Sequence, residues 1–208
     1  MRLDIAEANE RLHDASAEEI VRWALDLGRP TIASTSFGTN AAVMLHLVSQ
    51  IDTSIPTIWV DTGYNLRDTY IVADRLMHQL GLNLHVYSPD MTSERRNALM
   101  GGIPTIEDED QHQEFTRQVK LDPFSKALRD HQPEIWLTGI RQEETEHRQS
   151  LDVVSLDSRG IIKVAPIFYW SQEQVEDYME RFELPSARHY FDPTKVHDGR
   201  ECGLHTAA

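Results

Sequence analysis

Apolar runs of strand length alternate with segments of helical period along most of the 208 residues. The runs cover residues 31–36, 56–61, 82–87 and 134–139. A parallel strand needs a crossover connection, usually a helix, to pair with its neighbour, so this alternation is typical of a parallel sheet. We therefore predict an α/β fold with an open, mostly parallel, twisted sheet and helices on both faces.

Local signals add detail to this fold. Asn65 is expected to cap the helix that follows the second strand. Two short apolar runs at 153–156 and 161–164 flank a turn that contains glycine, which predicts a hairpin. The last helix covers residues 171–182, and its spacing predicts that Phe182 points inward with the other apolar residues.

Length and composition predict one domain over residues 1–208, ending in a C-terminal arm over 185–208 that has no periodicity. The opening segment is polar, and no run approaches the ~20 apolar residues of a membrane helix. We therefore expect a soluble, cytoplasmic protein with no membrane partner. The net charge of -14 argues against a nucleic-acid partner, because phosphate backbones are bound by clustered Lys and Arg.

Small polar residues follow the first strand. Ser34, Thr35, Ser36, Phe37 and Gly38 lie where that strand ends and a helix begins. Their hydroxyls, the backbone N–H groups and the helix dipole can converge on a phosphate. The segment matches neither a Walker A loop nor a dinucleotide glycine fingerprint. An ordinary helix cap is the alternative interpretation.

Asp61, Thr62 and Gly63 end the second strand. Open α/β sheets bind ligands at the carboxyl ends of their strands, and an acidic side chain there accepts hydrogen bonds from an adenine or a ribose. Gly63 permits a tight turn close to the ligand. The alternative is an aspartate that only caps the following segment.

Gly139 ends another strand and is followed by Arg141 and Arg148. Guanidinium groups bind phosphate or sulfate in a forked geometry. Arg141 is the stronger candidate of the two, because the glutamates close to Arg148 offer it local ion pairs. Both arginines are candidates for holding a polyanionic ligand.

Cys202 is the only cysteine of the chain and lies between Arg200 and His205. A nearby cation favours the thiolate, which is the nucleophilic form of the side chain. A buried cysteine that serves only for packing is the alternative. Zinc-competent side chains occur in this tail, but their spacing fits none of the usual patterns, so we expect no metal site.

Taken together, these segments resemble the sulfonucleotide reductases, and among them the phosphoadenosine phosphosulfate (PAPS) reductases. The Glu-Cys-Gly-Leu-His tail is the most specific signature. The Ser-Phe-Gly loop, the Asp-Thr-Gly-Tyr strand end and the Gly-Ile-Arg segment are each similar to a segment of that family. The resemblance runs from about residue 31 to residue 205.

The resemblance implies a modified PP-loop fold of the adenine nucleotide alpha hydrolase type. It implies that the cysteine thiolate attacks the sulfur of PAPS, that an S-sulfocysteine forms, and that thioredoxin or glutaredoxin then releases sulfite in assimilatory sulfate reduction. It also implies a homodimer without a bound cofactor. Matched by position, it assigns catalysis to Cys202, Arg200 and His205, and substrate binding to Ser34, Thr35, Ser36, Phe37, Gly38, Asp61, Thr62, Gly63, Lys120, Gly139, Arg141 and Arg148.

The related adenosine phosphosulfate (APS) reductases carry several cysteines that bind a four-iron cluster, and a single cysteine cannot supply that set. The chain departs from the PAPS reductases in a shorter connection before Cys202 and in Gln142, where the family has a second arginine. Three other functions stay open. They are a cluster-free reductase that prefers APS, an ATP-using adenylating enzyme or pyrophosphatase with a PP-loop, and a nucleotide-binding module without catalysis.

Overall fold

The computed structural model describes residues 3–105, 107–195 and 204. In chain order its helices and strands are α1 (Ile5–Leu12), α2 (Ala17–Asp26), β1 (Thr31–Thr35), α3 (Ala41–Ile51), β2 (Thr57–Val60), α4 (Arg67–Leu80), β3 (Leu84–Tyr87), α5 (Ser93–Met100), α6 (Glu109–Thr116), a π-helical turn (Arg117–Leu121), α7 (Asp122–His131), β4 (Ile135–Leu137), two 3₁₀ turns (Gln142–Glu144 and His147–Ser150), β5 (Val154–Leu156), β6 (Ile162–Val164) and α8 (Gln172–Arg181).

The strands form one sheet of six in the order β3-β2-β1-β4-β6-β5. Strand pairs are parallel except for β5 and β6, which form the predicted antiparallel hairpin at one edge. This confirms the predicted α/β fold. The strand order reverses at β1, which pairs with β2 on one side and β4 on the other. Ligands bind at such a switch point in open α/β sheets.

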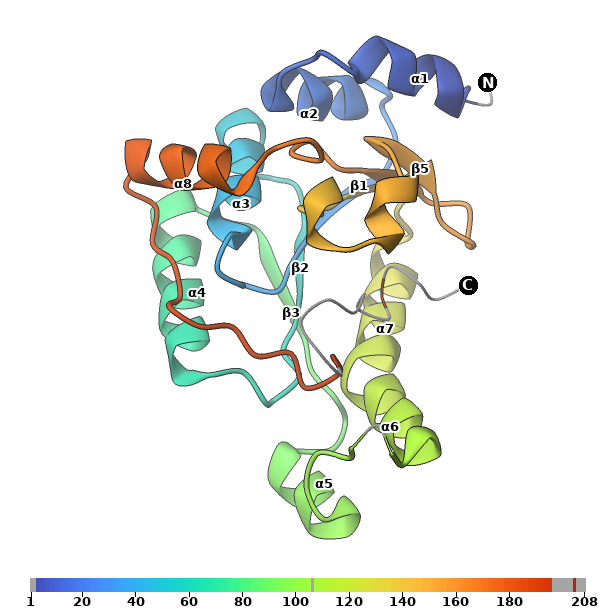
Figure 1. Ribbon diagram of the computed structural model, residues 1–208, viewed down its shortest axis with the longest axis vertical. Helices are drawn as coiled ribbons and strands as arrows, with labels where there is room; N and C mark the ends of the chain where they lie inside the picture. The colour runs from blue at the N-terminus through green and yellow to red at the C-terminus, as the bar shows by residue number, and fades with distance from the viewer. Residues whose placement is uncertain (1–2, 106, 196–203, 205–208) are drawn as a thin grey trace.

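Helices cover both faces of the sheet, as predicted (Figure 1). Ile32, Ile58 and Trp136 point to one face and pack with Phe124 and Ala127 of α7. Successive residues of a strand point to opposite faces, so the intervening positions pack against α2, α3 and α4 on the other face. Burial on both faces explains why β2 and β4 are almost continuously apolar.

Two local expectations are wrong. Helix α4 begins at Arg67 after Leu66, and Asn65 instead donates from Nδ2 to Asp61 Oδ1 at 2.9 Å. The carboxylate at the end of β2 thus competes successfully for this amide. Phe182 follows the last residue of α8 and is 37% exposed, and its ring packs against His46 and Tyr178 at the edge of the core rather than inside it.

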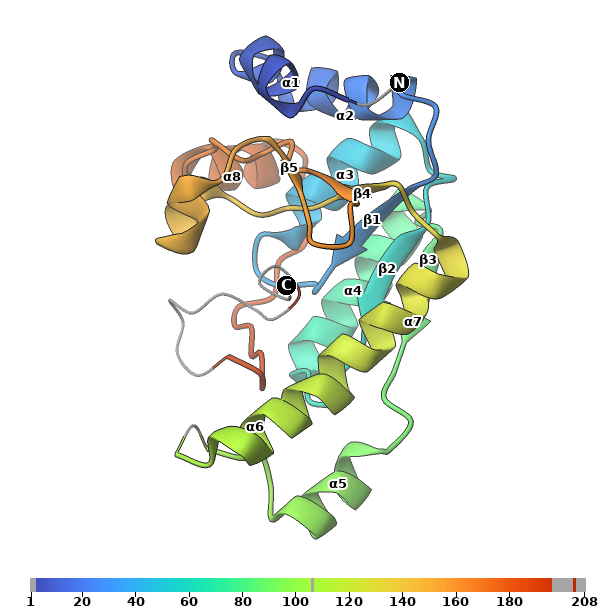
Figure 2. The same cartoon turned by 90° about the vertical axis from the view of Figure 1, so that its right-hand side faces the viewer.

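The segment between β3 and α7 extends away from the sheet (Figure 2). Helices α6 and α7 run nearly in line, joined by the π-helical turn. Such turns insert an extra residue into a helix and are frequent at functional sites. This one carries Lys120, whose side chain is buried. No helix within the described residues is long and apolar enough to cross a bilayer.

Candidate active site

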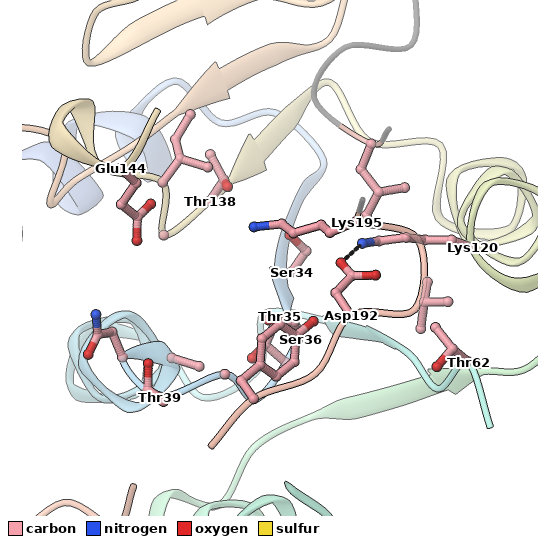
Figure 3. Close-up of a pocket in the computed structure, with 18 of the residues that line it drawn as sticks. Ser34, Thr35, Ser36, Thr39, Thr62, Lys120, Thr138, Glu144, Asp192 and Lys195 are labelled. Carbon is pink, nitrogen blue, oxygen red and sulfur yellow. Dashed lines mark hydrogen bonds and ion pairs between the residues drawn. The ribbon is translucent and has the colours of Figure 1, made fainter. Parts of the chain in front are cut away.

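A cavity of about 430 Å³ opens where the carboxyl ends of β1, β2 and β4 meet. Its size is typical of a small-molecule site, and it lies at the switch point of the sheet. The lining comes from the segments after these three strands, the π-helical turn and the start of the arm, residues 190–195. Figure 3 shows these segments around a common space.

The carboxyl end of β1 and the turn after it, residues 34–38, which we call the segment after β1, form one wall of the cavity through Ser34, Thr35, Ser36 and Gly38. Ser34 Oγ accepts a hydrogen bond of 2.7 Å from Nε1 of the buried Trp136 on β4, which fixes the position of this hydroxyl. Figure 3 shows Ser34, Thr35 and Ser36 close together on this wall. These hydroxyls and the first turn of α3 form the group that the sequence predicted for binding phosphate.

Phe37 belongs to the same segment but is not part of the cavity lining that the described residues form. Its side chain is fully buried and lies edge-on to Trp59, with ring centres 5.0 Å apart. Its φ of 50° is uncommon for a residue with a side chain. The Phe37 N–H donates to Thr35 Oγ1 at 3.0 Å, which closes the turn. The buried ring of Phe37 therefore anchors this segment to the core.

Asn40 precedes α3 and lines the cavity. Its side chain makes no capping hydrogen bond to the helix and instead donates from Nδ2 to Gln172 Oε1 at 3.0 Å. The first N–H groups of a helix lack partners within the helix. Here the Ala41 N–H donates to the Gly38 carbonyl at 3.1 Å and the Val43 N–H to the Asn40 carbonyl at 3.3 Å. No side chain of the described residues caps this end of α3, and its helix dipole favours an anionic ligand there.

At the end of β2, the cavity is lined by Thr62, whereas Asp61 and Gly63 lie outside the described lining. Asp61 Oδ1 accepts hydrogen bonds from the Gly63 N–H (3.0 Å), Asn65 Nδ2 (2.9 Å) and the Tyr70 hydroxyl (2.9 Å). Burial and the neighbouring Asp61 raise the pKa of Tyr70. In this conformation Asp61 organises the turn, and Gly63, with a φ of 78°, allows it.

At the end of β4, Gly139 lines the cavity but Arg141 does not. Only 3% of Arg141 is exposed. Its guanidinium donates to Glu143, to the Trp170 carbonyl at 3.2 Å and to Gln172 Oε1 at 2.7 Å. The sequence favoured Arg141 over Arg148 as the ligand contact, and the structure directs Arg141 to groups of the protein itself.

Arg148 lines the cavity together with Glu144, and the two side chains form an ion pair. The local pairing that the sequence suggested for Arg148 is therefore present. It does not remove the arginine from the site, since both partners face the same space. A ligand phosphate can compete with Glu144 for the guanidinium, because both are forked oxyanions.

Lys120 lines the opposite side of the cavity and pairs with Asp192, as Figure 3 shows. Both side chains are almost fully buried, and Thr194 donates to Asp192 Oδ1 at 2.6 Å. Burial alone would raise the pKa of Asp192, but Lys120 and Thr194 outweigh it and hold that pKa below the usual range. The pair ties the start of the arm to the π-helical turn.

Sequence reasoning missed several residues that line the cavity. Thr138 and Thr145 could have been found, since they flank the predicted Gly-Ile-Arg segment. Residues 190–195 carried no periodicity and no motif that placed them at a strand end. The missed lining residues with polar side chains are Thr39, Asn40, Asn65, Thr138, Glu144, Thr145, Tyr190, Asp192 and Lys195. The three residues predicted for catalysis, Arg200, Cys202 and His205, lie outside the described residues.

The chain is similar to characterised families in both sequence and fold. Residues 30–192 match the phosphoadenosine phosphosulfate reductase domain family. The chain is 36% identical to the phosphoadenosine 5'-phosphosulfate reductase of Synechocystis sp., over 98% of this chain and 91% of that protein. It is 37% identical to the protein of the same name from Synechococcus sp., over 87% of this chain and 78% of that protein.

Among solved structures, the PAPS reductase of Candida auris in a phosphate complex superimposes with a TM-score of 0.78 at 25% identity. The match covers 90% of this chain and 91% of that one. The FMN adenylyltransferase of Candida glabrata, with FMN and an ATP analogue, has a TM-score of 0.61 at 11% identity and shows a shared fold alone. On the family match and the identities together, the chain belongs to the phosphoadenosine phosphosulfate reductase family.

Proposed function

We propose that this protein reduces PAPS to sulfite and adenosine 3',5'-bisphosphate. The observation that carries the proposal is the cavity at the switch point, in a chain of this family. One wall of the cavity offers hydroxyls and the start of a helix, and the others bring Lys120, Arg148 and Lys195 to the same space. These cations attract an anionic substrate to the cavity, although the whole protein has a net charge of -14.

Within this cavity, the adenosine lies toward Thr62 at the end of β2, and the phosphosulfate group lies toward the segment after β1. Hydroxyl groups and the N–H groups at the start of α3 accommodate the anion. Arg148 exchanges part of its pairing with Glu144 for the ligand. Arg141 contributes by holding the segment after β4 in place.

The proposed reaction begins with the thiolate of Cys202. The thiolate attacks the sulfur of PAPS, the bond between that sulfur and the bridging oxygen breaks, and its electron pair stays on the 5'-phosphate. Arg200 and His205 favour the thiolate by their positive charge. One thiol of a reduced dithiol protein then attacks the Cys202 sulfur and expels sulfite. Its second thiol resolves the mixed disulfide, which restores the Cys202 thiol and supplies two electrons in all.

An external dithiol is required because the chain has a single cysteine and cannot form its own disulfide. We propose thioredoxin or glutaredoxin in this role. Catalysis as proposed requires no bound cofactor, metal or iron-sulfur cluster. We also propose a homodimer, in which each chain forms one domain with an arm over residues 185–208.

Intact-mass spectrometry tests the mechanism directly. The protein is mixed with PAPS in the absence of a dithiol donor, and a sulfonate adduct is expected on Cys202. Reduced thioredoxin should remove the adduct and release sulfite. Cys202→Ser should bind the nucleotide but form no adduct and no sulfite. A Cys202→Ser protein that still releases sulfite would contradict the mechanism.

A cluster-free enzyme that prefers APS remains the second candidate, and one observation favours it. Neither Arg141 nor Gln142 belongs to the described lining of the cavity. The segment that has two arginines in the family thus offers the 3'-phosphate of PAPS little positive charge here. Comparing kcat/KM for PAPS and APS decides between the two, and a higher value for APS would overturn our first choice.

A further inference from the structure

Lys195 is a cavity residue that no sequence motif pointed to. It lies at the start of the arm and is half-buried. Figure 3 shows its side chain extending across the cavity, away from Thr62, with the amine between Ser34 and Glu144. Ser34 lies near the carboxyl end of β1, and Glu144 lies in the 3₁₀ turn that follows β4, the strand paired with β1 at the switch point. The amine therefore faces the wall proposed for the phosphosulfate group.

The other cations near the cavity already have carboxylate partners. Lys120 pairs with Asp192, and Arg148 pairs with Glu144. Arg141 pairs with Glu143 and Glu144 and is not part of the described lining of the cavity. The amine of Lys195, in contrast, forms no hydrogen bond or ion pair with any residue that the structure describes. A ligand can therefore bind this amine without displacing a carboxylate of the described residues.

The backbone around Lys195 is held firmly. Asp192, Pro193 and Thr194 are buried, and Asp192 is tied to Lys120. The Lys195 N–H donates to the Asp192 carbonyl at 3.1 Å, which closes a turn. A side chain mounted on an anchored turn loses less conformational entropy when it binds a ligand.

We propose that Lys195 is a substrate-binding residue that holds the 5'-phosphosulfate group, whereas other groups hold the 3'-phosphate. This inference rests on the proposed function. When the thiolate attacks the sulfur, the bond to the bridging oxygen breaks and negative charge grows on the 5'-phosphate. A fixed ammonium at that phosphate stabilises the growing charge. The arm that supplies Cys202 thus also supplies a cation for the leaving group.

The proposal predicts which phosphate each variant loses. Lys195→Met keeps the length of the side chain and removes its charge, and Lys195→Arg keeps the charge. Lys126→Met is the matched control, because Lys126 is an exposed lysine of α7 outside the described lining of the cavity. Calorimetry compares each variant with the wild type for two nucleotides, adenosine 3',5'-bisphosphate and adenosine 3'-monophosphate.

Lys195→Met should lower the affinity for the bisphosphate about tenfold to hundredfold, the range of a hydrogen bond to a charged group, and leave the monophosphate unchanged. The affinity for the bisphosphate should also become less sensitive to salt. Lys195→Arg should keep most of the affinity, and Lys126→Met should behave as the wild type. In activity assays, Lys195→Met should lower kcat/KM for PAPS and APS by the same factor, because both contain the 5'-phosphosulfate.

An equal loss of affinity for both nucleotides, or no loss, would overturn the inference. A selective loss of activity toward PAPS would do the same, since it would assign Lys195 to the 3'-phosphate. A wild-type protein that binds neither nucleotide would contradict the proposed function itself. The calorimetric measurements need no turnover. A protein that binds both nucleotides as predicted but releases no sulfite would therefore support the role of Lys195 in binding while contradicting the proposed reaction.

Discussion

The segment after β1 and the charged residues around it build the same cavity in different ways. In the segment after β1, short side chains take their positions from the strand, from a turn closed by Thr35 and from the anchor Phe37. Around it, Lys120, Arg141 and the other cations have long side chains whose positions depend on carboxylates of the protein. Backbone geometry therefore places the first group, and counter-charges place the second.

This difference explains why two similar predictions led to different placements. Lys120 and Arg141 were both expected to contact the substrate, and both are buried next to an acidic residue. The partner of Lys120 lies on the arm beside the cavity, so the amine stays at the site. The guanidinium of Arg141 donates to Glu143, the Trp170 carbonyl and Gln172, none of which lines the cavity, so Arg141 stays outside the described lining although Glu144 lies 3.6 Å away.

The largest effect is expected from Lys120→Met, which leaves the buried carboxylate of Asp192 without its counter-charge. Breaking a buried pair in this way should lower the free energy of unfolding by about 3–5 kcal/mol at neutral pH. Urea denaturation measures this loss. In the double variant with Asp192→Asn the loss should be smaller, because no unpaired charge remains.

The same pair predicts a dependence on pH. The folded-state pKa of Asp192 is depressed, so its contribution to stability is present above the unfolded carboxyl pKa of about 3.9 and is lost as the pH falls through the folded value. In Lys120→Met the counter-charge is gone, and burial favours the protonated form of Asp192. The difference in free energy of unfolding between wild type and variant should therefore be smallest at acid pH. Equal losses at acid and neutral pH would contradict this account.

Arg141→Met is expected to have the next largest effect. It removes the donors to the Trp170 carbonyl and Gln172, which should cost about 1–3 kcal/mol of stability. Since Arg141 is not part of the described lining of the cavity, the KM for PAPS should stay unchanged, whereas Arg148→Met should raise it. A weaker nucleotide affinity without any loss of stability would show that Arg141 turns into the cavity when substrate binds.

Trp136→Phe tests the segment after β1. The change keeps an aromatic ring in the core and removes the indole N–H that donates to Ser34 Oγ. Stability should fall by more than the ~1 kcal/mol of a typical hydrogen bond, because the smaller ring also leaves a cavity in the core. Thermal denaturation of Trp136→Phe, Ser34→Ala and the double variant isolates the bond, and the two losses should be non-additive by about 1 kcal/mol. Additive losses would mean that the bond does not position Ser34.

The smallest effect is expected at Gln172, which joins the two regions by accepting from both Asn40 and Arg141. Gln172→Leu should cost about 0.5 kcal/mol, since its amide is at the surface. In a double-mutant cycle with Asn40→Ala, the two losses should be non-additive by about 0.5 kcal/mol. Additive losses would show that Gln172 does not hold Asn40.

Much of the fold could be predicted from the sequence. The alternation of strands and helices was sufficient for the parallel sheet and its hairpin, because burial on both faces imposes apolar runs. The cap assigned to Asn65 was wrong because the competing carboxylate of Asp61 lies within reach of its amide. Elements with a strong local sequence pattern were confirmed wherever they lie in the chain. The wrong expectations depended on weaker local patterns.

The candidate site was predictable where it follows strand ends. Ser34, Thr62 and Gly139 line the cavity because the carboxyl ends of neighbouring parallel strands meet at one edge of the sheet. The arm residues Asp192 and Lys195 could not be found in this way. They reach the cavity through a buried ion pair with Lys120, a contact between positions 72 residues apart in the sequence.

The sequence by itself determined the class of fold, the edge of the sheet where the cavity lies and the presence of a single thiol. Only the tertiary structure decided which cations line the cavity. A long flexible side chain on a given backbone can reach either a cavity or a carboxylate of the protein. Which one it reaches depends on the charges near it in the folded chain, some close in the sequence, as Glu144 is to Arg148, and some distant, as Asp192 is to Lys120.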